Sequence, residues 1–74
     1  MKVNVISIDS KNYEIADHDI YASLIPPDAE EVSKHELPQD IIELLELNDI
    51  FDEIPETVYV KKSNNNMLIY YVVS

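Results

Sequence analysis

Apolar side chains near both ends of the chain recur with the two-residue period of β-strands. Residues 2–9 alternate polar and apolar positions and then change phase, which predicts a strand that contains a bulge or is buried on both faces. Residues 57–62 alternate regularly, and residues 67–73 are apolar at almost every position. A shorter strand is expected at residues 13–16. The pattern therefore predicts a small antiparallel sheet formed by the two ends of the chain.

The middle of the chain follows the 3.6-residue period of amphipathic helices. The clearest helix is predicted for residues 39–47, where apolar and acidic residues occupy opposite sides of the helical wheel. Asn48 falls on the apolar side, so the helix is expected to end there. Two shorter helices are expected at residues 18–25 and 27–35, and a last helical turn at residues 49–54. The predicted fold class is α+β, with two to three short acidic helices between the strands of the sheet.

Length and composition limit the kinds of protein that this chain can be. With 74 residues we expect a single domain, 1–74, with a small core. The sequence has no cysteine, which excludes a disulfide scaffold, a thiol nucleophile and a zinc–thiolate site. It also has no glycine, which argues against a phosphate-binding loop. No apolar run reaches the length of a signal peptide or membrane helix, so a soluble, cytoplasmic protein is expected.

The negative charge is confined to one stretch of the sequence. The whole chain carries a formal charge of −10, and the stretch from Asp28 to Glu56 holds eleven acids against one base, Lys34, while the flanks cancel. Such a balance argues against direct binding to nucleic acid or to an anionic membrane. We predict that the acids of this stretch form the surface that binds a protein partner. They are Asp28, Glu30, Glu31, Glu36, Asp40, Glu43, Glu46, Asp49, Asp52, Glu53 and Glu56.

The spacing of these acids also indicates what kind of surface they form. A solvated helical surface normally mixes charges of both signs, whereas this stretch has almost no interleaved base. From Asp40 to Asp52 an acid recurs at every third residue, which corresponds to a rise of about 4.5 Å along a helix. Phosphates follow one another every 3.4 Å or so along each strand of duplex DNA. The acids are therefore expected to form a winding anionic ridge that imitates a phosphate backbone.

Two short motifs within the stretch, Asp-Ala-Glu-Glu at residues 28–31 and Glu-Leu-Leu-Glu at residues 43–46, are typical of this acidic character. In size, charge and strand-plus-helix build, the chain resembles the small acidic DNA-mimic proteins that phages use against host proteins. The resemblance implies an inhibitor that occupies the DNA-binding site of a basic host protein, in the cytoplasm of the host cell. A histone-like nucleoid protein is the first expected target. A DNA glycosylase, a Cas effector, a restriction enzyme or RNA polymerase are alternatives.

The apolar last strand and the five tyrosines suggest a different function. Because residues 67–73 are apolar on both faces, one face is expected to be covered by a second copy of the chain. The predicted homodimer interface consists of Met67, Ile69, Tyr71 and Val73. The alternative to a DNA mimic is an interaction module, such as an antitoxin or an adaptor, that binds its partner through this strand and the tyrosines.

The sequence offers little for catalysis or for metal binding. The best carboxylate groupings, Asp17-His18-Asp19 and residues 49–53, lack the pattern of a calcium loop. Both His18 and His35 are expected to lie on the surface, and no serine stands in a nucleophile-elbow pattern. We therefore expect no enzyme activity, no catalytic residue, no metal site and no cofactor.

Overall fold

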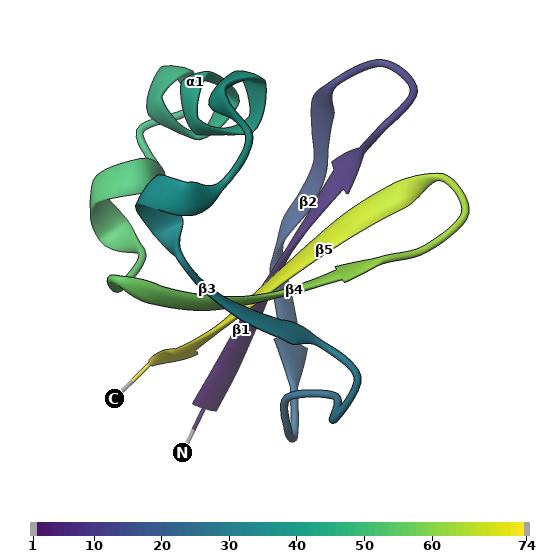
Figure 1. Ribbon diagram of the computed structural model, residues 1–74, viewed down its shortest axis with the longest axis vertical. Helices are drawn as coiled ribbons and strands as arrows, with labels where there is room; N and C mark the ends of the chain where they lie inside the picture. Colours follow the sequence, from purple (N-terminus) through teal and green to yellow (C-terminus); the bar gives the residue numbers. More distant parts are fainter. Residues whose placement is uncertain (1, 74) are drawn as a thin grey trace.

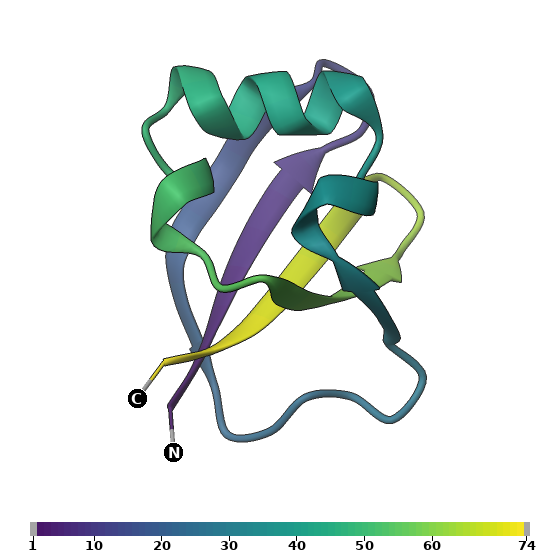
Figure 2. The same ribbon diagram turned by 60° about the vertical axis from the view of Figure 1, so that its left-hand side comes forward.

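The fold is a single antiparallel sheet with a helical layer on one face. The structure, a computed structural model, describes residues 2–73 apart from the side chain of Asp19. Five strands lie in the order β2-β1-β5-β4-β3 (Figure 1). Two 3-10 turns and one α-helix lie over one face of this sheet (Figure 2). The elements are β1 (Lys2–Asp9), β2 (Glu14–Ala22), β3 (Glu30–Ser33), η1 (Lys34–Glu36), α1 (Gln39–Leu47), η2 (Phe51–Glu53), β4 (Thr57–Lys62) and β5 (Asn66–Val73).

Strand β1 lies between β2 and β5 and pairs with both. Its pairing with β5 runs without interruption from Lys2 opposite Val73 to Asp9 opposite Asn66. Its pairing with β2 has register shifts on either side of Ser7, and at each shift the extra residue lies in β2, as where the consecutive residues Ser7 and Ile8 pair with Asp17 and Ile15. Most of β1 is also buried, as expected for a strand whose apolar residues change phase. Burial on both faces is therefore the correct explanation of the phase change. The bulge predicted within residues 2–9 is wrong, because β1 pairs regularly with β5 and the extra residues belong to β2.

The main core lies between the sheet and the helical layer. In α1 the side chains of Ile41 and Leu45 are buried, which confirms the predicted apolar side of this helix. They pack with buried residues of the sheet and of η2, including Ile6, Phe51 and Ile69. On the opposite face of the sheet, a smaller cluster consists of Val3, Val5 and Tyr70, with Ile25 among the partly buried residues packed against it.

The predicted fold class is wrong in its number of helices. The described chain is mostly sheet, with 48% of its residues in strands and one helix of seven or more residues. The helix expected at residues 18–25 is absent, because most of that segment continues β2, where Ile20 lies opposite Val5 and Ala22 opposite Val3. The two register shifts hide the two-residue period of this strand from a reading of the sequence alone.

The helix expected at residues 27–35 is also absent. Residues 30–33 form β3 instead, with Val32 paired to Val58 of β4 and packed against the core. Only Lys34–Glu36 turn helically, as the single turn η1. An edge strand of four residues is too short to show a clear alternation, and its acids, Glu30 and Glu31, also suit the first turn of a helix.

The remaining elements agree closely with the predicted ones. Helix α1 spans the predicted residues, and Asn48 forms its C-cap, as expected. The next residue, Asp49, has a φ of 57°, a left-handed conformation that ends the helix. The predicted last helical turn is shorter than expected and forms η2.

Strand β5 is covered within the single chain. Of the predicted dimer interface, Met67, Ile69 and Tyr71 are buried in the main core beneath the helical layer, and Val73 is partly buried against it. Because β5 pairs with β1 on one side and β4 on the other, it has no free edge. The cover that the sequence led us to expect from a second copy is thus supplied by the helical layer.

Candidate functional site

All eleven acids of the predicted partner-binding surface are exposed, but the structure divides them into two groups. One group has hydrogen-bond or ion-pair partners within the described chain, and the other has none. The acids with partners are Asp28, Glu36, Asp40 and Glu56. The acids for which the described residues provide no side-chain partner are Glu30, Glu31, Glu43, Glu46, Asp49, Asp52 and Glu53.

A group of polar residues, which we call the Ser33 junction, joins the sheet to the helical layer. It consists of Ser33, His35, Glu36 and Glu56. The Ser33 hydroxyl donates to Glu56 Oε1 at 2.7 Å, and His35 Nε2 lies 3.2 Å from Glu56 Oε2. The Ser33 backbone N–H donates to Glu36 Oε1 at 3.1 Å, and the Ser33 Oγ accepts the backbone N–H of His35 at 3.2 Å, which completes a capping box.

The junction stabilises the charged form of Glu56. The hydrogen bond from Ser33, followed by the charge and the hydrogen bond of His35, lowers the pKa of the Glu56 carboxyl below its usual value. The Ser-x-x-Glu pattern at residues 33–36 is a helix-start motif that the sequence analysis did not use. The two acids of the junction, Glu36 and Glu56, therefore make contacts that stabilise the fold.

The acids without partners are concentrated in one part of the chain, which we call the acidic segment, residues 43–53. It starts within α1 and ends with η2, so it runs along the outside of the helical layer (Figure 2). Its five acids are exposed, and Leu47 among them is 82% exposed. Leu47 lies between Glu46 and Asp49 in the sequence, so an exposed apolar side chain stands among exposed acids. The acids are Glu43, Glu46, Asp49, Asp52 and Glu53.

The predicted continuous ridge is interrupted. Its first acids, Asp40, Glu43 and Glu46, lie on α1, but the helix ends before Asp49 and Asp52. The left-handed conformation of Asp49 redirects the chain into η2. Beyond α1, acids three residues apart are therefore no longer separated by about 4.5 Å along one helix axis. The acidic segment is therefore a bent surface and not a helical line of charge.

Lys34, the one base of the acidic stretch, is withdrawn from the surface. It is 9% exposed, and its Nζ donates to the backbone carbonyls of Phe51 at 2.9 Å and Ile54 at 3.0 Å. The same ammonium lies 4.5 Å from the centre of the Phe51 ring. No pattern in the sequence predicted that Lys34 is buried. Its consequence is that the stretch from Asp28 to Glu56 presents eleven exposed acids and no exposed lysine.

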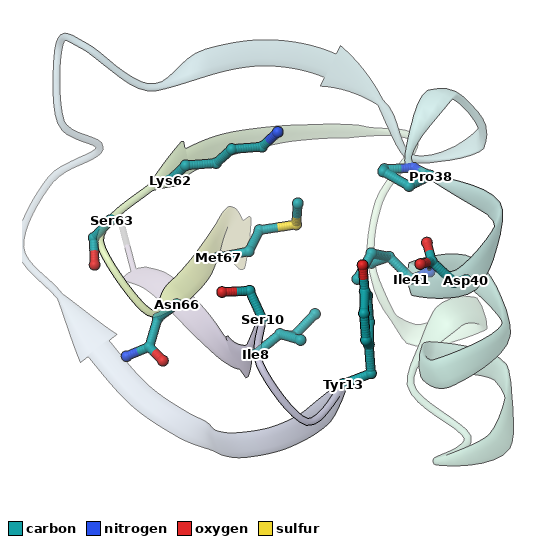
Figure 3. Close-up of a pocket in the computed structure, with 10 residues that line it drawn as sticks. All are labelled: Ile8, Ser10, Tyr13, Pro38, Asp40, Ile41, Lys62, Ser63, Asn66 and Met67. Carbon is teal, nitrogen blue, oxygen red and sulfur yellow. Dashed lines mark hydrogen bonds between the residues drawn. The ribbon is translucent and has the colours of Figure 1, made fainter.

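A pocket of about 250 Å³ lies where the β1–β2 turn and the β4–β5 turn meet the start of α1 (Figure 3). The buried side chains of Ile8, Ile41 and Met67 contribute its apolar lining. Tyr13 and Asp40 also line it, and a hydrogen bond from the Tyr13 hydroxyl to the Asp40 carboxylate, with the negative charge of Asp40, raises the pKa of Tyr13. Asp40 therefore belongs to this pocket as well as to the predicted acidic surface.

The other candidate residues remain apart from these sites. His18 and Asp17 are exposed on β2, and the side chain of Asp19 lies outside the described residues. Across residues 2–73 we find no group of three or more His, Asp or Glu side chains placed to hold a metal ion. The same residues include no helix with the length and apolar character needed to cross a membrane.

The chain is thus a small, acidic, mostly β protein with one α-helix among its described residues. Comparison with protein-family models, with curated proteins and with solved structures gives no match.

Proposed function

We propose that this protein is a DNA mimic, an inhibitor that places its acidic segment in the DNA-binding site of a basic host protein. The observation that carries the proposal is the concentration of five exposed carboxylates without cation partners between Glu43 and Glu53. Uncompensated charges at this density repel one another and reduce the stability of a small domain. A partner that supplies the missing cations would remove this repulsion on binding.

Two further features support a protein partner with a basic surface. The burial of Lys34 removes the one base that would weaken the field of the acidic stretch at the surface. Leu47 gives the acidic segment an apolar side chain that can be buried at the centre of an interface. The first target to test is a histone-like nucleoid protein, because a broad basic DNA-binding surface requires little beyond charge from its ligand. The same mechanism applies to a DNA glycosylase, a Cas effector, a restriction enzyme or RNA polymerase.

The test is displacement of a fluorescent DNA duplex from a purified histone-like nucleoid protein. We expect the protein to displace the duplex at low salt. Its own affinity for the nucleoid protein, titrated without DNA, should fall steeply as salt rises, because charged contacts are screened. Reversal of three acids of the segment, Glu43→Lys, Glu46→Lys and Asp49→Lys, should raise the concentration required for displacement at least about 100-fold. Failure to displace DNA from any of the five target classes at low salt would overturn the proposal.

A matched control variant tests whether the position of the acids, and not only the net charge of the protein, determines displacement. The variant Glu14→Lys, Glu30→Lys, Glu31→Lys changes the net charge equally, but its substitutions lie on the edge strands β2 and β3. We expect this variant to remain within about tenfold of the unaltered protein. Equal losses in the two triple variants would show that displacement depends on net charge alone, which contradicts the assigned surface.

A second candidate function is the interaction module, for which the structure changes the expected residues. Tyr70 and Tyr71 are buried, whereas Tyr21 is 57% exposed and Leu24, in the loop after β2, is 60% exposed. These exposed apolar side chains favour a contact at the end of β2 instead of at β5. Under this function, the pair Tyr21→Ser and Leu24→Ser abolishes partner binding while the triple charge reversal leaves it intact.

A further inference from the structure

The pocket beside Tyr13 contains two opposite charges that do not pair with each other. Asp40, in the first turn of α1, and Lys62, at the end of β4, both line it. Neither takes part in an ion pair among the described residues, although the adjacent Lys61 lies 3.3 Å from Asp28. Figure 3 shows Tyr13 and Lys62 at opposite walls of the pocket, with Met67 between them. A carboxylate and an ammonium are thus held apart over an apolar lining.

The carboxylate is fixed in position before any ligand arrives. Asp40 Oδ1 accepts the backbone N–H of Ile41 at 3.0 Å, and the Asp40 carboxylate raises the pKa of the Tyr13 hydroxyl beside it. A carboxylate has about four acceptor positions, so Asp40 retains capacity for a further donor. An oriented carboxylate of this kind loses little freedom when it binds a cation.

The walls of the pocket are also held together. The backbone N–H of Ser10 in the first turn donates to the carbonyl of Asn65 in the second at 3.0 Å. Asp9 Oδ1 accepts the backbone N–H of Lys11 at 2.8 Å, and the Tyr13 N–H donates to the Asp9 carbonyl at 2.8 Å. The two hairpin turns therefore form one connected rim.

Tyr13 adopts an unfavourable backbone conformation that brings its ring to the pocket. Its φ is 52°, in the left-handed region, which is unfavourable for a bulky side chain. Asn12, one residue earlier, is of a type that tolerates this conformation far better. Strain of this kind is concentrated at ligand-binding sites, where the conformation serves the site.

We propose that this pocket binds a small zwitterion with an apolar body, with its ammonium group at Asp40 and its carboxylate at Lys62. The body of the ligand packs against Ile8, Ile41 and Met67. The volume of about 250 Å³ lies just below the lower limit of about 300 Å³ that is usual for drug-sized ligands, so it suits a molecule of amino-acid size. This site is independent of the acidic segment and of the DNA-mimic function.

The test is an NMR titration of the isotope-labelled full chain with L-leucine and with 6-aminohexanoate. Butylamine and hexanoate provide analogues with only one of the two charges, and glycine provides a zwitterion without an apolar body. We expect saturable shifts of the Met67 methyl and Tyr13 ring signals with at least one of the two zwitterions. Each single-charge analogue and glycine should bind at least tenfold more weakly, because each lacks one of the three contacts.

Variants assign the two charges separately. With Asp40→Asn, the zwitterion should bind at least tenfold more weakly and no better than hexanoate. With Lys62→Gln, it should bind no better than butylamine. Glu43→Gln on the same helix and Lys61→Gln on the same strand are the matched controls, and both should retain the affinity of the unaltered protein.

Two outcomes would overturn the proposal. One is a set of shifts that never saturates or that leaves the Met67 methyl unmoved for both zwitterions. The other is equal binding of the zwitterions, the single-charge analogues and glycine, which would indicate a non-specific apolar cavity. Because these titrations contain no DNA-binding protein, their result stands apart from the test of the acidic segment.

Discussion

The Ser33 junction and the acidic segment are built from the same acidic side chains but use them in opposite ways. At the junction, Glu56 is 2.7 Å from the Ser33 hydroxyl and 3.2 Å from His35, and its charge is bound into the fold. Along the acidic segment, acids such as Glu43 and Asp52 are exposed and meet no cation of the described chain. The difference teaches that a count of acids is a poor guide to function, because some exposed acids already take part in hydrogen bonds and ion pairs of the fold while others do not.

Lys34 connects the two regions, which gives the comparison its sharpest test. Its backbone lies in η1 next to the junction, while its ammonium binds the carbonyls of Phe51 and Ile54, at the end of the acidic segment. Replacement by Met leaves two buried acceptors without a donor, so Lys34→Met should lower the free energy of unfolding by about 2–4 kcal/mol. Urea unfolding followed by circular dichroism measures this loss.

The control for that experiment is Lys61→Met, which removes an exposed lysine. The ion pair between Lys61 and Asp28 lies at the surface, where such pairs contribute about 1 kcal/mol or less. We expect Lys61→Met to change stability by no more than that. Equal effects of the two substitutions would mean that the buried contacts of Lys34 do not hold the helical layer to the junction.

A smaller effect is expected at the junction itself. Ser33→Ala removes the N-cap of η1 and the hydroxyl that binds Glu56, so it should cost about 1 kcal/mol at pH 7. Because the pKa of Glu56 is lower in the folded state than in the unfolded chain, its contribution is present above the usual carboxyl range and is lost as pH falls through the folded pKa. The difference between the unaltered protein and Ser33→Ala should therefore shrink between pH 7 and strongly acidic pH, as measured by urea unfolding at each pH. A constant difference would show that the capping of η1, and not the charge of Glu56, is what Ser33 provides.

The smallest effect is expected in the acidic segment and has the opposite sign. Neutralising three acids by Glu43→Gln, Glu46→Gln and Glu53→Gln removes repulsion without removing a contact, so stability should rise by roughly a few tenths of a kcal/mol at low salt. The gain should disappear at about 0.5 M NaCl, where exposed charges are screened. Thermal unfolding over a series of salt concentrations measures both. A loss of stability at low salt would show that these acids have structural partners and would remove the contrast with the junction.

The sequence predicted those parts of the fold that depend on regular local periods. Helix α1 has a clear apolar side and a proline at its start, so its limits were found, as were those of β1 and β4 and nearly those of β5. Strand β2 was largely missed because two register shifts lie between Ile15 and Ile20 and interrupt the two-residue period of its apolar positions. A bulge is set by the neighbouring strand, and a reading of one segment at a time cannot detect it.

The candidate site was predictable to a similar degree. All eleven acids are exposed, as expected, because carboxylates are rarely buried without partners. Which of them have partners depends on contacts between distant residues, such as Ser33 with Glu56, and these are fixed only when β3 and β4 pair. The pocket between Asp40 and Lys62 likewise joins three separate parts of the chain, and no local motif marks it.

The pairing of β1 with β5 has a consequence for how the chain folds. The hairpins β1–β2 and β4–β5 each join neighbouring segments and can form early, but the seam between them requires the first and last strands to meet. Closing so long a loop costs more conformational entropy than closing either hairpin, so the seam is expected to limit the folding rate. During synthesis, one edge of β1 stays open until β5 has left the ribosome. The helical layer, which packs across both sides of the seam, can complete its core only after that moment.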